Sequence, residues 1–251
     1  MDPKKSIVIA NWKMKLGVHD SLRLASQLKA VSSLHAEIVV CPSFVSLFGV
    51  AEILKKSKVK VGAQDVFWQT SGTYTGEVSA EELKEVGCEY VLIGHSERRK
   101  ILHETDQQVC QKIKAALGAG ITPVVCVGET FEERERGAKD FILIEQLTKA
   151  FDGTTIDPSQ QIVVAYEPVW AISPGRPIDP SEAELAQQVI HQTLIDLFPL
   201  EMVNNNMRII YGGSVDPKNV NAFISLEHTA GVLVGSASLR AESFIELIQR
   251  V

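Results

Sequence analysis

Residues 90–129 read YVLIGHSERRKILHETDQQVCQKIKAALGAGITPVVCVGE, and this stretch decides the fold. Its two ends, 90–96 and 122–129, each contain four consecutive apolar residues bounded by turn-forming residues. Short apolar runs of this kind are typical of strands that are buried on both faces. The segment between them, 104–120, has a threonine where a helix cap belongs and glycines where a helix would end. The stretch therefore predicts one strand–helix–strand unit.

The same alternation runs along the whole chain. Strand-like apolar runs occur at 6–12, 37–44, 59–65, 90–96, 122–129, 161–168, 207–214 and 231–237. Segments with helical spacing or helix caps lie between and after them, at 20–34, 79–87, 104–120, 181–198, 216–226 and 240–251. Eight strand-like runs alternating with helical segments in about 250 residues predict a (β/α)₈ barrel, with residues 1–251 forming one domain. The alternative is an open doubly wound sheet, but the glycine-rich turn that usually follows its first strand is missing.

Composition narrows the class of protein. The chain has 251 residues, is 45% hydrophobic and has a formal net charge of −6, with no basic stripe, which argues against a nucleic-acid partner. No segment approaches the ~20 apolar residues of a membrane span. The four cysteines form no Cys-x-x-Cys pair, which favours a reduced, cytoplasmic protein. Neither a metal-binding spacing nor a P-loop is present, so we expect no metal and no nucleotide bound in the P-loop manner.

Polar residues gather where the predicted strands end, which is where a barrel carries its active site. Asn11 and Lys13 follow the first strand, His95 the fourth and Glu167 the sixth. A carboxylate, an imidazole and an ammonium group together can remove a proton next to a carbonyl and stabilise the oxygen that becomes negative. Glycine-containing turns after the last two strands offer free backbone N–H groups for a phosphate. These residues predict a small phosphorylated carbonyl compound as the substrate.

The chain also resembles a known family along nearly its full length. The motifs that carry the resemblance are NWKMK, GAQD, YTGEVS, VLIGHSERR, CVGET, AYEPVWAI, YGGSV and LVGSASL, in this order. Each motif alone is weak, but eight in order are specific, and together they resemble the triosephosphate isomerases. The resemblance implies an enzyme that interconverts dihydroxyacetone phosphate and D-glyceraldehyde 3-phosphate through an enediolate, in glycolysis and gluconeogenesis. It also implies that no cofactor is used and that the protein is a homodimer.

The resemblance implies catalytic roles for five residues. Glu167 is expected to move the proton between the two substrate carbons, and His95 to polarise the carbonyl. Lys13 is expected near the phosphate and the enediolate, with Asn11 beside it, and Glu97 close to Lys13 and His95. Substrate binding is expected from Asn11, Lys13, Ser173, Ser214, Gly235 and Ser236, the last four through backbone N–H groups.

Two further expectations concern local structure. Ser96 is expected to cap a helix, so that His95 faces the positive end of the helix dipole and stays neutral. The apolar segment after Glu167 is expected to close over the substrate as a lid. Its continuation, Ser173-Pro174-Gly175-Arg176-Pro177, departs from the family pattern, as does Gly235-Ser236 in place of two glycines.

The segment 66–79 is too long for an ordinary turn and contains Phe67, Trp68 and Tyr74. An apolar loop of this length is typical of an interface. The resemblance implies that its tip, near Thr75, docks beside the catalytic residues of a second subunit.

Three alternative functions are weighed against this interpretation. Another phosphate-handling barrel enzyme would need a different set of catalytic groups. A barrel that binds triose phosphates without catalysis is suggested by the altered lid. A structural or partner-binding protein would not need charged groups at the strand ends.

Overall fold

The computed structural model describes residues 5–171 and 178–251, and in these residues it contains a closed barrel of eight parallel strands in sequence order. The strands are β1 (Ser6–Asn11), β2 (Ala36–Cys41), β3 (Val59–Ala63), β4 (Tyr90–Ile93), β5 (Thr122–Val127), β6 (Ile162–Tyr166), β7 (Met207–Tyr211) and β8 (Gly231–Val234). β1 pairs with β8 and closes the barrel. The predicted (β/α)₈ fold is confirmed, and the open doubly wound sheet is excluded.

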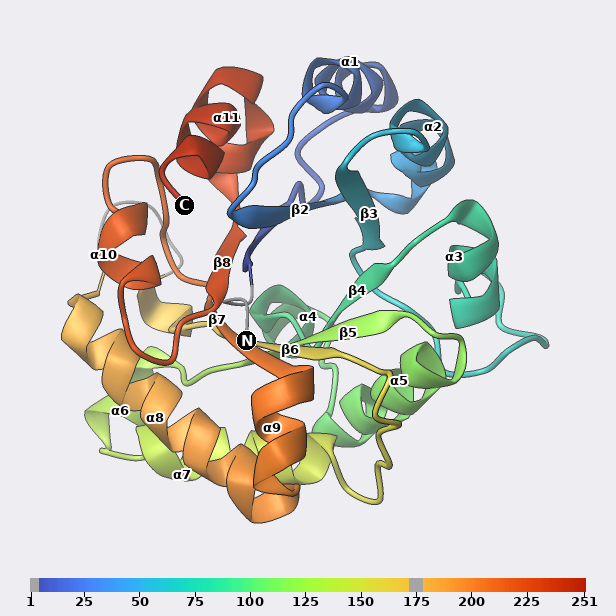
Figure 1. Ribbon diagram of the computed structural model, residues 1–251. Helices are drawn as coiled ribbons and strands as arrows, with labels where there is room; N and C mark the ends of the chain where they lie inside the picture. The colour runs from blue at the N-terminus through green and yellow to red at the C-terminus, as the bar shows by residue number, and fades with distance from the viewer. Residues whose placement is uncertain (1–4, 172–177) are drawn as a thin grey trace.

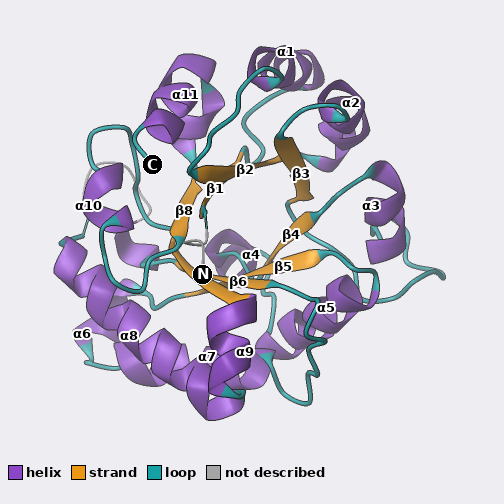
Figure 2. Cartoon of the chain, in the orientation of Figure 1, coloured by secondary structure: helices purple, strands orange, loops and turns teal. Residues whose placement is uncertain are grey.

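Helices surround the barrel on the outside (Figures 1 and 2). They are α1 (Val18–Leu28), α2 (Phe44–Leu54), α3 (Ala80–Val86), α4 (Ser96–Ile101), α5 (Asp106–Gly118), α6 (Phe131–Glu135), α7 (Lys139–Ala150), α8 (Pro180–Leu197), α9 (Leu200–Asn206), α10 (Val220–Ile224) and α11 (Ala241–Gln249), with 3-10 turns η1 (Val169–Ala171) and η2 (Ser236–Leu239). The helix expected over 104–120 forms, and Thr105 and Gln108 close a capping box at its start. The helix expected over 20–34 ends earlier, at Leu28.

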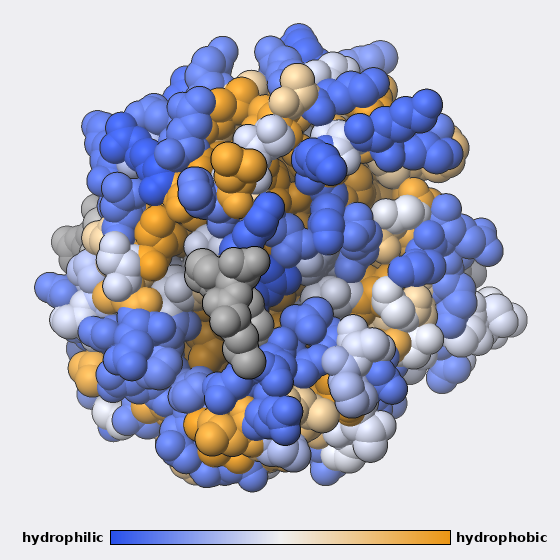
Figure 3. All heavy atoms as spheres, in the orientation of Figure 1, coloured by the Kyte–Doolittle hydropathy of each residue, from blue (hydrophilic) through white to orange (hydrophobic). Residues whose placement is uncertain are grey.

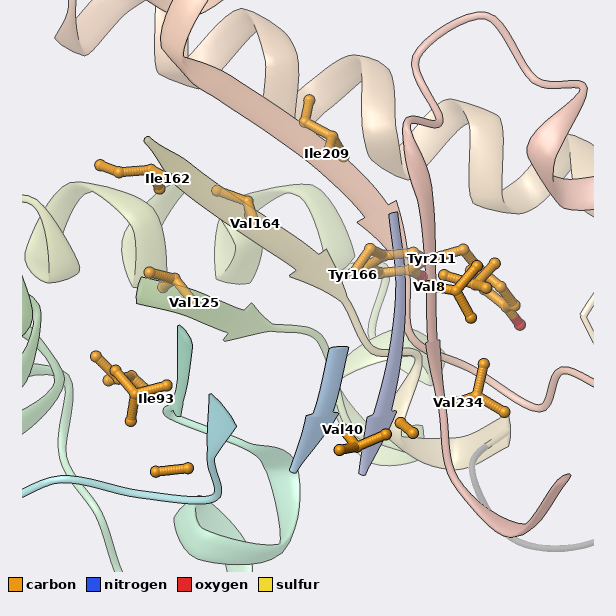
Figure 4. Close-up of a cluster of buried hydrophobic side chains, with 14 of the residues drawn as sticks. Val8, Val40, Ile93, Val125, Ile162, Val164, Tyr166, Ile209, Tyr211 and Val234 are labelled. Carbon is orange, nitrogen blue, oxygen red and sulfur yellow. The ribbon is translucent and has the colours of Figure 1, made fainter. Parts of the chain in front are cut away.

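Alternation of side chains along the strands divides the core into two clusters. Inside the barrel lie Ile7, Ile9, Val39, Cys41, Tyr90, Leu92, Val124, Cys126, Val163, Ala165, Ile210 and Leu233. The residues between them point outward and pack under the helices, and Figure 4 shows part of this larger outer cluster, including Val8, Ile93, Val125 and Ile209. Both faces of each strand are therefore buried, as the short apolar runs predicted.

Two findings bear on the class of protein. No helix of the described residues is long and apolar enough to cross a membrane. Cys41, Cys88, Cys110 and Cys126 are all buried and free, so no disulfide links them.

Candidate active site

Glu167 lies at the carboxyl end of β6 with only 2% of its surface exposed. One carboxylate oxygen, Oε2, accepts a hydrogen bond from the backbone N–H of Ser96 at 2.9 Å. The other, Oε1, lies 3.1 Å from Nε2 of His95. The first turn of α4 thus holds a buried carboxylate directly against an imidazole.

His95 itself is the N-terminal cap of α4, and its Nδ1 accepts a hydrogen bond from the backbone N–H of Glu97 at 3.2 Å. The expectation that Ser96 caps this helix is wrong, because Ser96 is already its first residue. An imidazolium ion has no acceptor, so this hydrogen bond assigns the neutral ring with its proton on Nε2. Nε2 lies 3.1 Å from the Glu167 carboxylate. The cap is thus the arrangement that the neutral ring expected from the sequence would make.

Lys13 reaches the same end of the barrel from β1. Its backbone has φ = 50°, a left-handed conformation that is uncommon outside glycine. The side chain of Asn11 accepts the Lys13 N–H at 2.9 Å, and Gln64 donates to the Lys13 carbonyl at 2.9 Å. Lys13 Nζ forms an ion pair with Glu97 Oε1 at 2.7 Å. Three polar contacts thus hold a strained backbone that directs this ammonium group.

These residues surround one small cavity of about 70 Å³. Its walls are Asn11, Lys13, His95, Glu167, Gly212, Gly213, Ser214, Val215, Leu233, Gly235 and Ser236. It adjoins a wider groove of about 980 Å³, to which Glu97 and Lys15 also contribute. The structure thus places together every residue that the sequence singled out, except Ser173. Ser173, with the rest of the 172–177 segment, lies outside the described residues.

Two glycines that the sequence analysis did not single out as supports allow Glu167 to sit where it does. A Cβ at Gly128 would lie 1.7 Å from the Glu167 carbonyl oxygen, and one at Gly212 would lie 3.0 Å from its Cγ. The first distance is far inside van der Waals contact. Both glycines stand at strand ends, which was the available sequence signal, but only the packing shows which neighbour requires them.

Glu129 is a second buried carboxylate, with none of its surface exposed. Its oxygens accept hydrogen bonds from Trp170 Nε1 at 2.8 Å and from the Tyr166 hydroxyl at 3.2 Å. Burial raises the pKa of Glu129 and outweighs these hydrogen bonds, which lower it. Arg134 stacks on the Trp170 ring at 4.3 Å from its centroid and pairs with Glu182 at 2.7 Å. These contacts fix the segment that directly follows Glu167.

A buried ionic cluster supports α4 from the other side. Arg98 pairs with Glu104 at 2.5 Å and with Asp65 at 2.9 Å, and Lys112 pairs with Asp65 at 2.6 Å. Burial raises the pKa of Asp65 despite its cationic neighbours. The cluster connects the end of β3 to α4 and α5, and so orients the turn that carries His95.

The arrangement is suited to proton transfer. A buried carboxylate, an imidazole and an ammonium group face one cavity, and glycine-containing turns after β7 and β8 form another part of its wall. No group of three or more His, Cys, Asp or Glu in the described ranges is placed to hold a metal ion. A (β/α)₈ barrel that carries such a site at the carboxyl ends of its strands belongs to the class of barrel enzymes.

Comparison with known proteins specifies the family. The family model described as triosephosphate isomerase matches residues 6–251. Triosephosphate isomerase of Dehalococcoides mccartyi is 43% identical over 249 residues, covering 98% of this chain and 96% of that protein. That of Carboxydothermus hydrogenoformans is 41% identical over 250 residues, covering 98% of each, and that of Dictyoglomus thermophilum is 39% identical over 248 residues, covering 98% and 99%. The chain belongs to the triosephosphate isomerase family.

Proposed function

We propose that this protein is the enzyme that interconverts dihydroxyacetone phosphate and D-glyceraldehyde 3-phosphate in glycolysis and gluconeogenesis. The family assignment supports the reaction and the phosphorylated triose substrate. The observation that carries the proposal at the chemical level is the contact of Glu167 with His95, 3.1 Å apart on the wall of one cavity.

In this proposal Glu167 removes a proton from one substrate carbon and returns it to the neighbouring carbon. The carboxylate must release its contacts with Ser96 and His95 to reach the substrate, which frees the Nε2 proton of His95 for the carbonyl oxygen. Lys13 stabilises the negative charge that develops on that oxygen, because an ammonium group in a water-poor cavity acts strongly on nearby charge. Asn11 and Glu97 position Lys13 through the contacts described above.

The phosphate is proposed to bind opposite Glu167, on the backbone N–H groups of Ser214, Gly235 and Ser236, together with Ser173. The first three line the cavity, and Gly235 leaves the space next to Lys13 unfilled: a Cβ there would lie 3.7 Å from Lys13 Cε. Backbone N–H groups at such turns bind phosphate oxygens without a side chain in the way.

We also propose a homodimer formed through loop 66–79. Phe67 packs on Trp68 and Tyr74 within the loop, at centroid distances of 4.1 and 4.7 Å, which leaves the loop tip projecting. The segments that follow the adjacent strands β1 and β2 expose apolar side chains: Met14 is 93% exposed and Val45 80%. Apolar surface shared by three neighbouring segments is typical of an interface. A cytoplasmic location is part of this proposal, and four buried free cysteines are compatible with it.

The test is a coupled assay of triose phosphate interconversion in both directions on the purified chain. We expect turnover with the phosphorylated triose and a large loss of kcat with unphosphorylated glyceraldehyde, because binding of the phosphate supports the chemical step. Binding of the triose phosphate without turnover, and without exchange of its proton with solvent, would show the non-catalytic alternative instead. Equal kcat values for the two substrates would mean that the phosphate site is misplaced.

A further inference from the structure

The amino ends of the strands carry a second polar cavity, remote from the candidate active site. Figure 1 faces this end of the barrel, with α4 behind the strands, and Figure 3 shows the same face, which is largely hydrophilic at its rim. The cavity has a volume of about 550 Å³, within the ~300–1,000 Å³ range of small-molecule sites. Its described walls are Lys5, Glu37, Lys60, Lys84, Glu89, Tyr90, Gly120, Thr122, Gln161, Asn205 and Arg208.

The floor of this cavity is the lowest layer of the barrel interior. Glu37, Lys60, Tyr90 and Arg208 alternate with outward-facing residues of β2, β3, β4 and β7 and so point inward. Arg208 and Lys60 pair with Glu37 at 2.7 and 2.6 Å, and the Tyr90 hydroxyl donates to Glu37 at 2.6 Å. A barrel needs only to fill this layer, which apolar side chains would do at lower desolvation cost. Here the layer is instead a network in which two cations and a tyrosine hydroxyl donate to one carboxylate.

Positive charge is in excess in this cavity. Among its described walls are four cationic side chains and two carboxylates, although the whole protein has a formal charge of −6. Both carboxylates are already paired, since Lys60 reaches Glu37 and also Glu89 at 3.1 Å. Lys84 donates only to the Gly120 carbonyl, at 2.8 Å, and Lys5 forms no ion pair in the described part of the chain.

Hydrogen-bond donors are also in excess. Arg208 is 9% exposed, and its Nε is buried without a hydrogen-bond partner among the described residues. Glu37 already accepts from three donors, so it has little capacity left for more. Lys84 and Lys5 remain available at the rim, and Gln161 and Asn205 add neutral donors there. The described walls therefore offer more donors than their two carboxylates can accept from.

From this geometry we infer that the amino-end cavity is a second anion site, which binds a small molecule bearing a phosphate dianion. Two positive charges in excess match the charge of a phosphate near neutral pH, and ammonium groups with amide donors are its usual partners. The free ion and a phosphomonoester share this chemistry, and the volume accommodates either.

The experiment uses the full-length protein and inorganic phosphate as the probe, measured by equilibrium dialysis at constant ionic strength. The test variant is Lys5→Gln/Lys84→Gln. The matched control is Lys29→Gln/Lys114→Gln: Lys29 is exposed like Lys5, and Lys114 donates to a backbone carbonyl, of Asp152, at 2.7 Å, as Lys84 does. Both variants remove the same charge, so the comparison separates a local site from general attraction.

The wild type and the control should bind one phosphate more per chain than the test variant, whose affinity at this site should fall about tenfold or more. The test variant should keep its kcat, KM and inhibition by phosphate, which report the catalytic cavity. If the wild type showed no turnover, the proposed function would fail, but the dialysis comparison would still test the amino-end site. Equal phosphate binding by the wild type and the test variant, or an equal loss in the control, would overturn the site. Competition with methyl phosphate then distinguishes the two sources: displacement below the concentration needed for unlabelled phosphate identifies a phosphomonoester.

Discussion

At the scale of single residues, the site depends on how its charged groups are held. Glu167 is almost fully buried, and its contacts with His95 and Ser96 both come from one turn at the start of α4. In the proposed reaction the carboxylate must exchange both contacts for the substrate before it acts as a base. Lys13 is held by a comparable set of contacts in a strained backbone. Backbone groups supply part of this support: the N–H of Ser96 for Glu167 and the N–H of Glu97 for His95.

Replacing the carboxylate tests the role of Glu167. Glu167→Gln keeps the shape but cannot accept a proton, so kcat should fall by about 10²–10⁴-fold or more, with a modest change in KM. The measurement is steady-state kinetics in the coupled assay. Glu81→Gln, at an exposed position of α3, is the control and should be neutral. Turnover of Glu167→Gln within tenfold of the wild type would rule out this residue as the base.

Glu37 leads to a prediction about pH. Burial raises its pKa, but hydrogen bonds from Lys60, Tyr90 and Arg208 lower it more, to about 2 from an ordinary value of 4.5. Since the folded pKa is lower than the unfolded one, the stability from this carboxylate is present above pH 4.5 and is lost as pH falls toward 2. Urea unfolding at pH 7 should show Glu37→Gln less stable by about 1–3 kcal/mol. That difference should shrink from about pH 5 to about pH 3, and a constant difference would contradict the assignment.

At the scale of elements, the strand ends decide where catalytic groups can lie. β5 and β6 pair in parallel, and the backbone of Glu167 continues this contact by donating its N–H to the Val127 carbonyl at 2.7 Å. Gly128 lies at this contact, where the ends of β5 and β6 approach too closely for any side chain at position 128. The 3-10 turn η1 then begins directly and is held by the buried Glu129. The position of the base is therefore a property of two adjacent strand ends.

Gly128→Ala tests this contact. The new Cβ would meet the Glu167 carbonyl oxygen, so the strand ends must separate and the carboxylate must move. A displacement of about 1 Å costs on the order of a hundredfold in rate, so kcat should fall by about that factor. Gly118→Ala is the matched control, because no heavy atom lies within 4 Å of its Cβ position at the end of α5. The measurement is steady-state kinetics of the two variants. Full activity in both would show that Gly128 does not set the position of Glu167.

At the scale of the whole molecule, the two ends of the barrel interior differ in kind. An apolar middle layer separates a carboxyl end with a small cavity from an amino end with a wider, positively charged one. The apolar exposure of Met14 and α2 belongs to the carboxyl end, beside the projecting loop 66–79. An interface there would cover the candidate active site from the side and would lie at the opposite end of the barrel from the amino-end cavity.

The proposed dimer leads to a prediction about assembly. Met14→Arg places a charge on the proposed interface, where Met14 is 93% exposed in the single chain, and should yield monomers with poor activity. Leu200→Arg alters a 54% exposed apolar residue on α9, away from loop 66–79, and should leave a dimer. Sedimentation equilibrium at micromolar concentration measures whether the wild type and each variant are monomers or dimers. A wild-type chain that is fully active as a monomer would refute the dimer.

The sequence by itself determined the fold and the family, because both depend on features that are local in the chain. Apolar runs of four residues mark buried strands, helix caps mark their neighbours, and eight motifs in order mark the family. It also indicated which residues meet at the cavity, since parallel strands bring their carboxyl ends to one edge. The tertiary structure alone decided the close contacts: the cap that His95 forms on α4, the hydrogen bond from Trp170 to Glu129, and the close approach at Gly128. It also brought Glu37, Lys60 and Arg208, far apart in the chain, into one charged layer. These depend on distances of a few ångströms between segments that no local pattern encodes.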